Sequence, residues 1–213
     1  MSSVVSFPNR CNAWGNPKYP GNCDGRLFAG LVARYGARRV ADPMEGSGTT
    51  RHVVEWLNRK AGTQIEYWGS DLHAGFNLHA HDLPGEYDLV WIHPPYWNIV
   101  RYSDNPADLS SCEDYDAFVE RLRVCLRRCA AALAPGGRLA VLVGDIRKHG
   151  RYFPMVRDVL NLEAELGKLA SVIIKLQHNC RSDRKTYGKM EEVPIRHEYC
   201  VVFRNAGVQR AAA

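Results

Sequence analysis

The chain has 213 residues, enough for one domain with a sizeable core and too few for two full domains. Its 46% hydrophobic and 24% charged residues are typical of a globular protein, and the lack of any apolar run of about 18 residues argues against a membrane-spanning helix. The formal net charge of +5 permits nucleic-acid binding but does not require it.

Seven cysteines are scattered along the chain without a C-x-x-C pair, and residues 1–9 lack the basic and apolar segments of a secretory signal. These features predict reduced thiols in a cytoplasmic protein. Cys125 and Cys129 lie one helical turn apart among leucines, a spacing that favours packing in the core over metal binding. We therefore expect neither a metal site nor a membrane partner.

The first part of the chain alternates between strands and helices. Residues 1–25 are rich in Asn, Pro and Gly and predict an irregular arm, and Asp24 is placed to cap a helix over 25–35. The elements expected next are a strand over 39–42, a glycine turn over 43–48, a helix from Ser47 or Thr49 to about Lys60, and a strand over 65–69.

The second part continues this alternation. Residues 87–92 are nearly all apolar, which predicts a central strand. The later elements are expected to be a loop over 97–114, a helix over 115–133 ended by Pro135 to Gly137, a strand over 138–143, a helix over 154–169, and strands over 171–176 and 198–204. Strands that alternate with helices predict an α/β fold with a mainly parallel sheet.

A glycine-rich turn, Asp42 to Thr50, lies between the first predicted strand and the next helix. Glycines let the backbone approach a ligand, and the helix N-terminus offers free N–H groups there. In a doubly wound sheet, ligands lie beyond the carboxyl ends of the strands. Arg51 occupies the third glycine position of the dinucleotide pattern, which argues against NAD, while a tight turn without a ligand stays an alternative.

Two carboxylates follow in suitable places for a cofactor. Asp71 comes at the end of the second strand, where a carboxylate can accept hydrogen bonds from ribose hydroxyls. Asp82 precedes the third strand and can accept from an adenine amino group. A role in a turn or helix cap is the structural alternative for Asp71, and a role in a turn for Asp82.

The segment His93-Pro94-Pro95-Tyr96-Trp97-Asn98 comes directly after the central strand. Two prolines fix the backbone and remove two donors, which leaves carbonyl groups in a rigid geometry. The adjacent tyrosine offers a flat face on which a base can stack. A Pro-Pro-aromatic sequence that follows a central strand and lies downstream of a glycine turn is a far more specific signal of a functional site than Pro-Pro alone.

These motifs resemble those of the DNA amino-methyltransferases that modify N4 of cytosine or N6 of adenine. Asp42 to Thr50 is similar to their cofactor motif D-P-F-x-G-S-G-T-T, and His93 to Tyr96 is similar to their catalytic motif D/N/S-P-P-Y/F/W. The resemblance extends over roughly residues 12 to 205, and the motif order resembles the family's gamma type. Its other parts are the N-terminal cofactor motif at 16–22 and strand segments at 135–138, 143–145 and 197–204.

The resemblance implies a Rossmann-like fold of S-adenosylmethionine-dependent methyltransferases, with a mainly parallel seven-stranded sheet and helices on both faces. It implies an arm over 1–25 that contributes to the cofactor site, one methyltransferase domain over 26–205 with a small target-recognition region within about 147–197, and a disordered tail over 206–213. The implied cofactor is S-adenosyl-L-methionine, and the residues expected to bind it are Tyr19, Asn22, Asp42, Met44, Gly46, Ser47, Gly48, Thr49, Asp71, Leu72, Asp82 and Leu83.

The implied reaction takes place on a base that is flipped out of the duplex, since a stacked base is out of reach. The implied catalytic residues are His93, Pro94, Pro95 and Tyr96. Contacts to the substrate are expected from Trp97, Asn98, Arg101, Tyr102, Arg147, Lys148, Arg181, Arg184 and Lys185. The implied partner is double-stranded DNA, with single-stranded DNA, a homodimer and a separate specificity partner as open alternatives.

His93 departs from the family, in which Asp, Asn or Ser occupies this position. In the family, that side chain and the carbonyl of the first proline are thought to accept hydrogen bonds from the target amino group. A neutral imidazole can also accept one, and it can take the released proton. The likeness of Pro94 to Asn98 to members with S-P-P-Y-W-N favours N4 of cytosine over N6 of adenine.

Three other functions stay open from the sequence. They are methylation of an RNA base, methylation of a release-factor glutamine by enzymes with N-P-P-Y, and an inactive nucleic-acid-binding module. The basic residues near Arg184 argue against the protein substrate, and the intact glycine turn argues against the inactive module. A dinucleotide-dependent oxidoreductase is disfavoured by Arg51 and by Pro94-Pro95, which has no role there.

Overall fold

A seven-stranded sheet forms the centre of the computed structural model, which describes residues 1–178 and 191–206. The strand order is β1-β8-β9-β5-β4-β2-β3, and β9 alone runs antiparallel to its two neighbours. The strands of this sheet are β1 (Val4–Ser6), β2 (Arg39–Asp42), β3 (Glu66–Gly69), β4 (Tyr87–Ile92), β5 (Leu133–Val143), β8 (Lys168–Leu176) and β9 (His197–Arg204). The expected mainly parallel seven-stranded sheet is confirmed.

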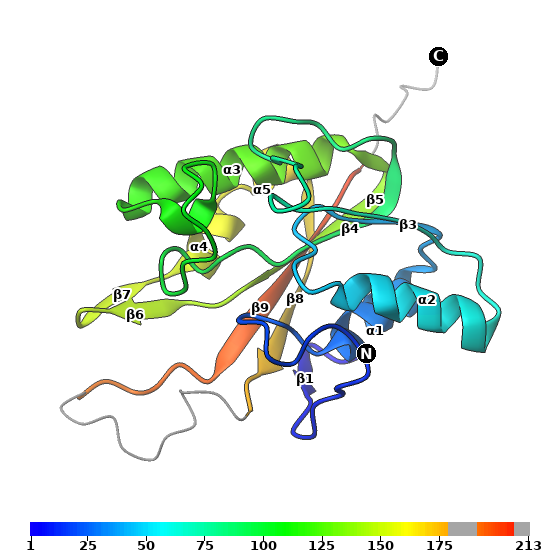
Figure 1. Ribbon diagram of the computed structural model, residues 1–213, viewed down its shortest axis with the longest axis horizontal. Helices are drawn as coiled ribbons and strands as arrows, with labels where there is room; N and C mark the ends of the chain where they lie inside the picture. The colour runs from blue at the N-terminus through cyan, green and yellow to red at the C-terminus, as the bar shows by residue number, and fades with distance from the viewer. Residues whose placement is uncertain (179–190, 207–213) are drawn as a thin grey trace.

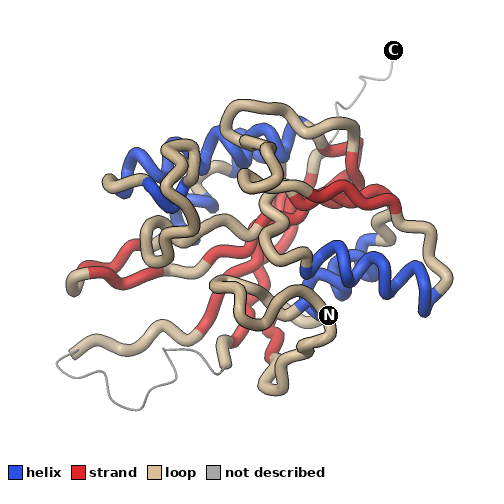
Figure 2. Tube along the Cα trace, in the orientation of Figure 1, coloured by secondary structure: helices blue, strands red, loops and turns tan. Residues whose placement is uncertain are grey.

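Helices cover both faces of the sheet, as Figures 1 and 2 show. The pair α1 and α2 lies on one face, and α3, α4 and α5 lie on the other. The helix bounds are α1 (Gly25–Tyr35), α2 (Thr49–Ala61), η1 (Leu109–Ser111), α3 (Tyr115–Ala131), α4 (Met155–Leu160) and α5 (Glu163–Leu166).

Strand β4 explains why the core has two halves. Leu89 and Trp91 pack with α1 and α2, whereas Val90 and Ile92 pack with the α3 side. Successive side chains of a strand point to opposite faces, so an almost continuous apolar run buries both faces of a central strand. Burial on both sides fixes the register of β4 and therefore the position of the residues that follow it.

Several predicted elements agree closely with the structure. The N-cap of α1 is Asp24, whose carboxylate accepts a hydrogen bond from the backbone N–H of Arg26. The strand over 39–42, the strand over 87–92 and the helix that starts at Thr49 are also confirmed. Cys125 and Cys129 are buried in the core, as their spacing predicts.

The expected helix over 154–169 is wrong in extent. The chain forms two short helices there, and β8 begins at Lys168. Gly167 separates helix from strand with a φ of 112°, and a Cβ at this position would lie 2.6 Å from the Arg204 carbonyl oxygen. The non-helical backbone of Gly167 ends the helix, and only glycine fits this close to β9.

The strand expected over 138–143 begins earlier than predicted, at Leu133. The Pro-Gly-Gly segment lies within β5, where the pairing with β4 shifts register between Tyr87 and Leu89. A Cβ on Gly137 would lie 2.8 Å from the Tyr87 carbonyl oxygen, so this glycine permits the close approach of the two strands.

The structure contains a strand and a hairpin that were not predicted from the sequence. The arm contains β1, whose Val4 pairs with Ile174 of β8. A hairpin of β6 (Ile146–Lys148) and β7 (Arg151–Phe153) follows β5. Its two turn residues have positive φ values, 49° at His149 and 79° at Gly150, as two-residue hairpins favour.

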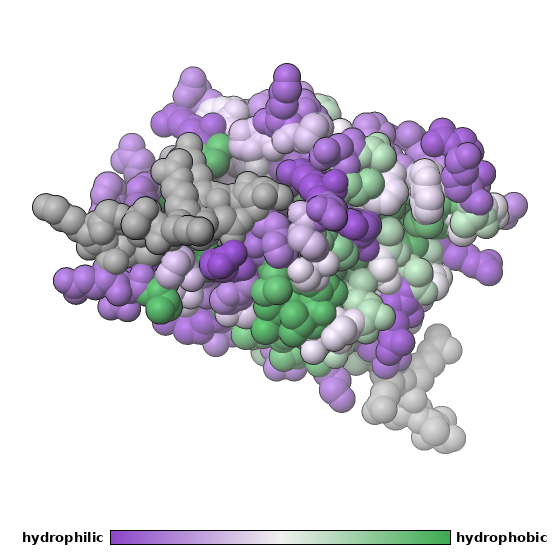
Figure 3. Space-filling model, turned by 90° about the horizontal axis from the view of Figure 1, so that it is seen from below, coloured by the Kyte–Doolittle hydropathy of each residue, from purple (hydrophilic) through white to green (hydrophobic). Residues whose placement is uncertain are grey.

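On the face that Figure 3 shows, hydrophilic side chains predominate, although apolar side chains gather in one part of it. Within the described residues, no helix combines the length and the hydropathy that crossing a membrane requires.

Candidate active site

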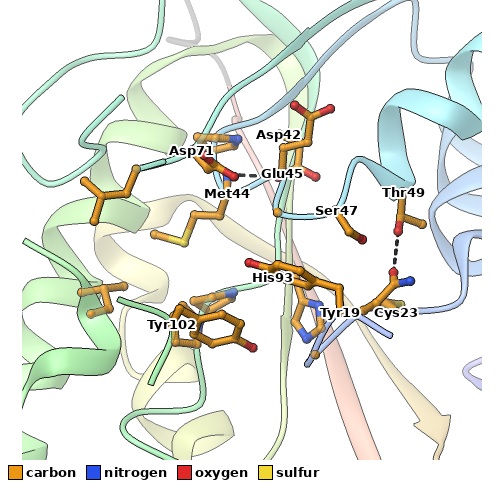
Figure 4. Close-up of a pocket in the computed structure, with 18 of the residues that line it drawn as sticks. Tyr19, Cys23, Asp42, Met44, Glu45, Ser47, Thr49, Asp71, His93 and Tyr102 are labelled. Carbon is orange, nitrogen blue, oxygen red and sulfur yellow. Dashed lines mark hydrogen bonds between the residues drawn. The ribbon is translucent and has the colours of Figure 1, made fainter. Parts of the chain in front are cut away.

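One pocket lies at the carboxyl ends of β2, β3 and β4, and segments far apart in the sequence line it. These segments are the arm, the glycine turn after β2, the stretch after β3, the end of β4 and the loop that follows β4. Figure 4 shows labelled side chains from the arm, the glycine turn and His93 around this space. Parallel strands end at the same sheet edge, which brings these motifs together.

The glycine turn adopts a conformation that only glycine accepts easily. Gly46 has a φ of 53° and Gly48 a φ of 76°. A Cβ on Gly46 would lie 3.1 Å from the Tyr19 ring, so the arm packs closely on the turn. The N-cap of α2, Gly48, provides no side-chain cap, which leaves the first N–H groups of the helix for other acceptors.

Asp42 lies buried at the end of β2 and lines the pocket. Its carboxylate accepts hydrogen bonds from the Thr50 hydroxyl at 2.6 Å and from the Met44 backbone N–H at 3.1 Å. Burial outweighs these two bonds and raises the pKa of Asp42 to about 7. The carboxyl group therefore changes charge near neutral pH.

Residues of α2 and β3 hold the glycine turn in place. The Tyr67 hydroxyl lies 2.8 Å from that of Thr50 and donates to Glu45 at 3.0 Å. Arg51 completes the network with two hydrogen bonds of 2.7 Å to Glu45. Arg51, which occupies the third glycine position of the dinucleotide pattern, therefore stabilises the glycine turn through Glu45.

The arm closes one side of the pocket. Asn22 accepts a hydrogen bond from the Thr49 hydroxyl at the start of α2. Tyr19 stacks on Tyr102 with ring centroids 5.8 Å apart, and the Tyr102 hydroxyl donates to the Pro20 carbonyl. Sequence reasoning assigns Tyr19 to the cofactor and Tyr102 to the substrate, and the structure brings both to the pocket.

Asp71 and Leu72 also line the pocket, and Asp71 accepts a hydrogen bond of 2.9 Å from the Ala74 backbone N–H. The structure does not bring Asp82 and Leu83 there. The Asp82 side chain is 83% exposed and paired with Arg128, while Leu83 is buried in the core. The segment between these carboxylates supplies the lining instead, through Phe76, Asn77, Leu78 and His79.

The segment His93 to Tyr96 lines the pocket from the end of β4. His93 Nε2 lies 3.0 Å from the Tyr96 hydroxyl, and that hydroxyl donates to Glu198 Oε1 at 2.8 Å. The Tyr96 ring packs on Gly144, where a Cβ would lie only 2.8 Å from it. The tyrosine is therefore held at its hydroxyl and at its ring.

The His93 imidazole is neutral at neutral pH. Burial, opposed by the charge of Glu198 and assisted by the charge of Lys175, lowers the pKa of His93 to about 4. A neutral ring has one nitrogen that donates and one that accepts. His93 can therefore accept a hydrogen bond or a proton from a ligand.

Most of the expected substrate residues lie away from the pocket. Trp97 is buried against Tyr115 and Phe153, and its Nε1 donates to the Cys112 carbonyl. The remaining polar residues have partners: Asn98 accepts from Lys148, Arg101 pairs with Asp104, and the Arg147 guanidinium lies over the Tyr152 ring. Arg181, Arg184 and Lys185 lie outside the described residues.

Two pocket residues, Glu198 and Cys23, were not predicted from the sequence. Glu198 is paired with Lys175 of β8, and its only signal in the sequence is a carboxylate next to the apolar part of the final strand. The Cys23 thiol stays protonated at neutral pH because burial raises its pKa to about 12. In the loop after β4, Ile99 and Val100 line the pocket together with Tyr102, and Trp97 does not.

No protein-family model matches the chain. A segment is 32% identical over 125 residues to CymA of Salinispora arenicola, whose name proposes a non-canonical nonribosomal peptide synthetase. This match covers 56% of the chain and 2% of CymA. The chain therefore corresponds to a small part of this curated relative.

The solved structures similar to the chain include two that bear on its fold and function. One, from Thermus thermophilus, is named with a proposed DNA modification methylase activity and was solved with S-adenosyl-L-methionine. It is 29% identical to this chain with a TM-score of 0.43, and the match covers 64% of this chain and 54% of that one. The other, from Listeria monocytogenes, is named with a proposed class I S-adenosylmethionine-dependent methyltransferase activity; it has 15% identity, a TM-score of 0.52 and coverage of 87% and 60%. The second likeness confirms the expected Rossmann-like fold of class I methyltransferases.

Proposed function

We propose that the chain transfers a methyl group from S-adenosyl-L-methionine to an exocyclic amino group of a DNA base. The observation that carries this proposal is that the glycine turn and the segment His93 to Tyr96 line one pocket. A cofactor loop and a rigid set of acceptors at a shared site are what a methyl transfer to nitrogen requires.

The pocket has groups that match the parts of S-adenosyl-L-methionine. Asp42 supplies a carboxylate for the cationic amino end, and the uncapped start of α2 supplies N–H groups for the carboxylate. Asp71 supplies acceptors for the ribose hydroxyls, and Phe76 and Leu78 supply apolar surface for the adenine. When bound, this cofactor supplies an electrophilic methyl group.

The residues after β4 would hold the nucleophile. His93 and the Pro94 carbonyl accept hydrogen bonds from the target amino group, which directs the nitrogen lone pair away from the ring. The neutral state of His93 suits this role, because a protonated imidazole has no acceptor atom. Tyr96 fixes the position of His93 from the other side.

Incubation with labelled cofactor and DNA, RNA or protein tests this function. We expect label in DNA and N4-methylcytosine in its nucleoside digest, measured by mass spectrometry. The motif likeness of Pro94 to Asn98 favours cytosine. A digest with only N6-methyladenine would overturn the choice of base, and label confined to RNA or protein would overturn the substrate class.

The pKa of Asp42 predicts that cofactor affinity depends on pH. Below about pH 7 burial keeps this carboxyl group protonated, so binding of a cationic amino group must expel a proton. We expect the affinity to rise by up to about tenfold per unit between about pH 5.5 and pH 7 and then to level off. Calorimetry at several pH values measures this change.

Asp42→Asn is the control for this experiment. The variant should bind the cofactor more weakly and without the rise, since its side chain does not titrate. An affinity of the unmodified protein that is constant over this pH range would contradict the assigned role of Asp42.

A further inference from the structure

Four polar side chains form a continuous chain of contacts beside the pocket. His93 Nε2 contacts the Tyr96 hydroxyl at 3.0 Å, Tyr96 contacts Glu198 at 2.8 Å, and Glu198 contacts the Lys175 ammonium at 2.5 Å. The residues come from β8, β9 and the end of β4, so the sheet fixes their relative positions. Only His93 and Tyr96 belong to the sequence motif.

The charges of this chain determine which atoms donate. The Lys175 and Glu198 side chains are 11% and 8% exposed and form an ion pair. Burial raises the pKa of Glu198, but the charges of Lys175 and His93 and the hydrogen bonds from Lys175 and Tyr96 together outweigh burial, so the pKa lies below its ordinary value. An ionised carboxylate has no proton to give, so Tyr96 donates its one hydroxyl proton to Glu198.

The remaining contact then fixes the His93 tautomer. Since the Tyr96 proton points at Glu198, the Tyr96 oxygen can only accept from His93, and the imidazole proton must lie on Nε2. In a neutral imidazole the other nitrogen, Nδ1, is then the acceptor. Among the hydrogen bonds within residues 1–178 and 191–206, none engages Nδ1.

We propose that Lys175, Glu198 and Tyr96 are positioning residues that hold the His93 proton on Nε2 and leave Nδ1 as the acceptor for the substrate amino group. The inference rests on the proposed function, because it assigns an atom to a step of that reaction. It adds two residues, Lys175 and Glu198, that lie outside the Pro-Pro-Tyr motif.

The proton balance of the transfer follows from this arrangement. As the bond from the amino nitrogen to the methyl carbon forms and the sulfur–carbon bond breaks, the nitrogen gives up one proton to Nδ1. His93 then carries a proton on each nitrogen and a positive charge. Its Nε2 proton still points at Tyr96, and the Glu198 carboxylate stabilises the new charge through the tyrosine, as a buried carboxylate does for a catalytic imidazole in hydrolases.

Nitrogen-15 NMR of the full chain, labelled at histidine, tests the tautomer without any methyl acceptor. His93→Gln identifies the His93 signals. We expect a neutral imidazole at pH 7 with the proton on Nε2 and an unprotonated Nδ1. A proton on Nδ1 would overturn the inference.

Tyr96→Phe tests whether the tyrosine sets this state. The variant removes the acceptor of the Nε2 proton, so we expect a mixture of both tautomers. The matched control is Tyr199→Phe. In β9, His197 Nε2 contacts the Tyr199 hydroxyl at 2.7 Å, so this variant removes a similar histidine–tyrosine contact that does not involve His93. The control should leave the His93 signals unchanged, and His93 signals unchanged in Tyr96→Phe would contradict the proposal.

The ion pair is tested with a double variant that keeps the net charge, Lys175→Met with Glu198→Gln. The amide oxygen of the new glutamine can still accept a hydrogen bond from the Tyr96 hydroxyl, but the variant lacks the carboxylate that stabilises protonated His93. We expect kcat to fall by about tenfold or more, with an unchanged Kd for the cofactor and an unchanged KM for DNA. An unchanged kcat would contradict the role of Glu198.

These measurements separate the inference from the proposed function. Suppose that the His93 proton lies on Nε2 and depends on Tyr96, but the chain methylates no DNA, RNA or protein. The proposed function and the role of Nδ1 as acceptor for the substrate would then be refuted, while the tautomer assignment would stand. Methylation of DNA by a chain with the proton on Nδ1 would refute the inference alone.

Discussion

Replacement of His93 by alanine is expected to reduce methyl transfer by about 10²- to 10⁴-fold, the range that positioned acid–base groups contribute. The imidazole lines the pocket and is neutral at pH 7, so its loss removes the acceptor for the amino group. The contacts assigned to the cofactor come from other segments, and the Kd for S-adenosyl-L-methionine should stay within about twofold. Single-turnover rates with saturating DNA and calorimetry measure the two effects.

His197→Ala is the matched control for this experiment. His197 also contacts a tyrosine hydroxyl, but it does not line the pocket. Its replacement should leave the rate nearly unchanged. If His93→Ala kept the full rate, the role assigned to His93 would be wrong, and if it lost cofactor binding as well, the residue would belong to the cofactor site.

The second large effect is on stability. Glu198→Gln leaves the largely buried Lys175 ammonium without its counter-charge, and we expect the free energy of unfolding to fall by about 3–5 kcal/mol. Adding Lys175→Met should restore most of this loss, because the two buried charges are then both absent. Urea denaturation followed by circular dichroism measures the three proteins.

A surface pair provides the comparison. Glu165 lies 2.9 Å from Arg123, and both side chains are partly exposed, at 27% and 37%. Solvent screens such a pair, so Glu165→Gln should change the free energy of unfolding by less than about 1 kcal/mol. Equal losses at Glu165 and Glu198 would mean that burial of the Lys175 pair contributes nothing to stability.

Local chemistry explains which elements the sequence predicts well. Asp24 caps α1, and the run over 87–92 forms β4, because capping and apolar periodicity are properties of neighbouring residues. The end of the helix before Gly167 depends instead on close packing against Arg204, which is distant in the sequence. Contacts of this kind leave little local signal, so the predicted boundary is displaced.

The same distinction applies to the candidate site. The glycine turn, Asp71 and the segment after β4 are recognisable because each follows a predicted strand, and parallel strands end at one edge. Glu198 is not recognisable in this way, because it reaches Tyr96 across a sequence separation of 102 residues from an antiparallel strand. Asp82 illustrates the opposite error, since its place in the sequence suits an adenine but its side chain turns to Arg128.

The short strand β1 has a consequence for association of the protein. It covers part of β8 through pairs such as Val4 with Ile174, and the opposite edge of the sheet is the four-residue strand β3. Unpaired backbone groups on a long edge strand can recruit a strand from another molecule. With β1 in place, the backbone of β8 from Ile174 to Leu176 is paired, and the strand at the opposite edge is short, so less of the sheet edge is open to a strand from another molecule.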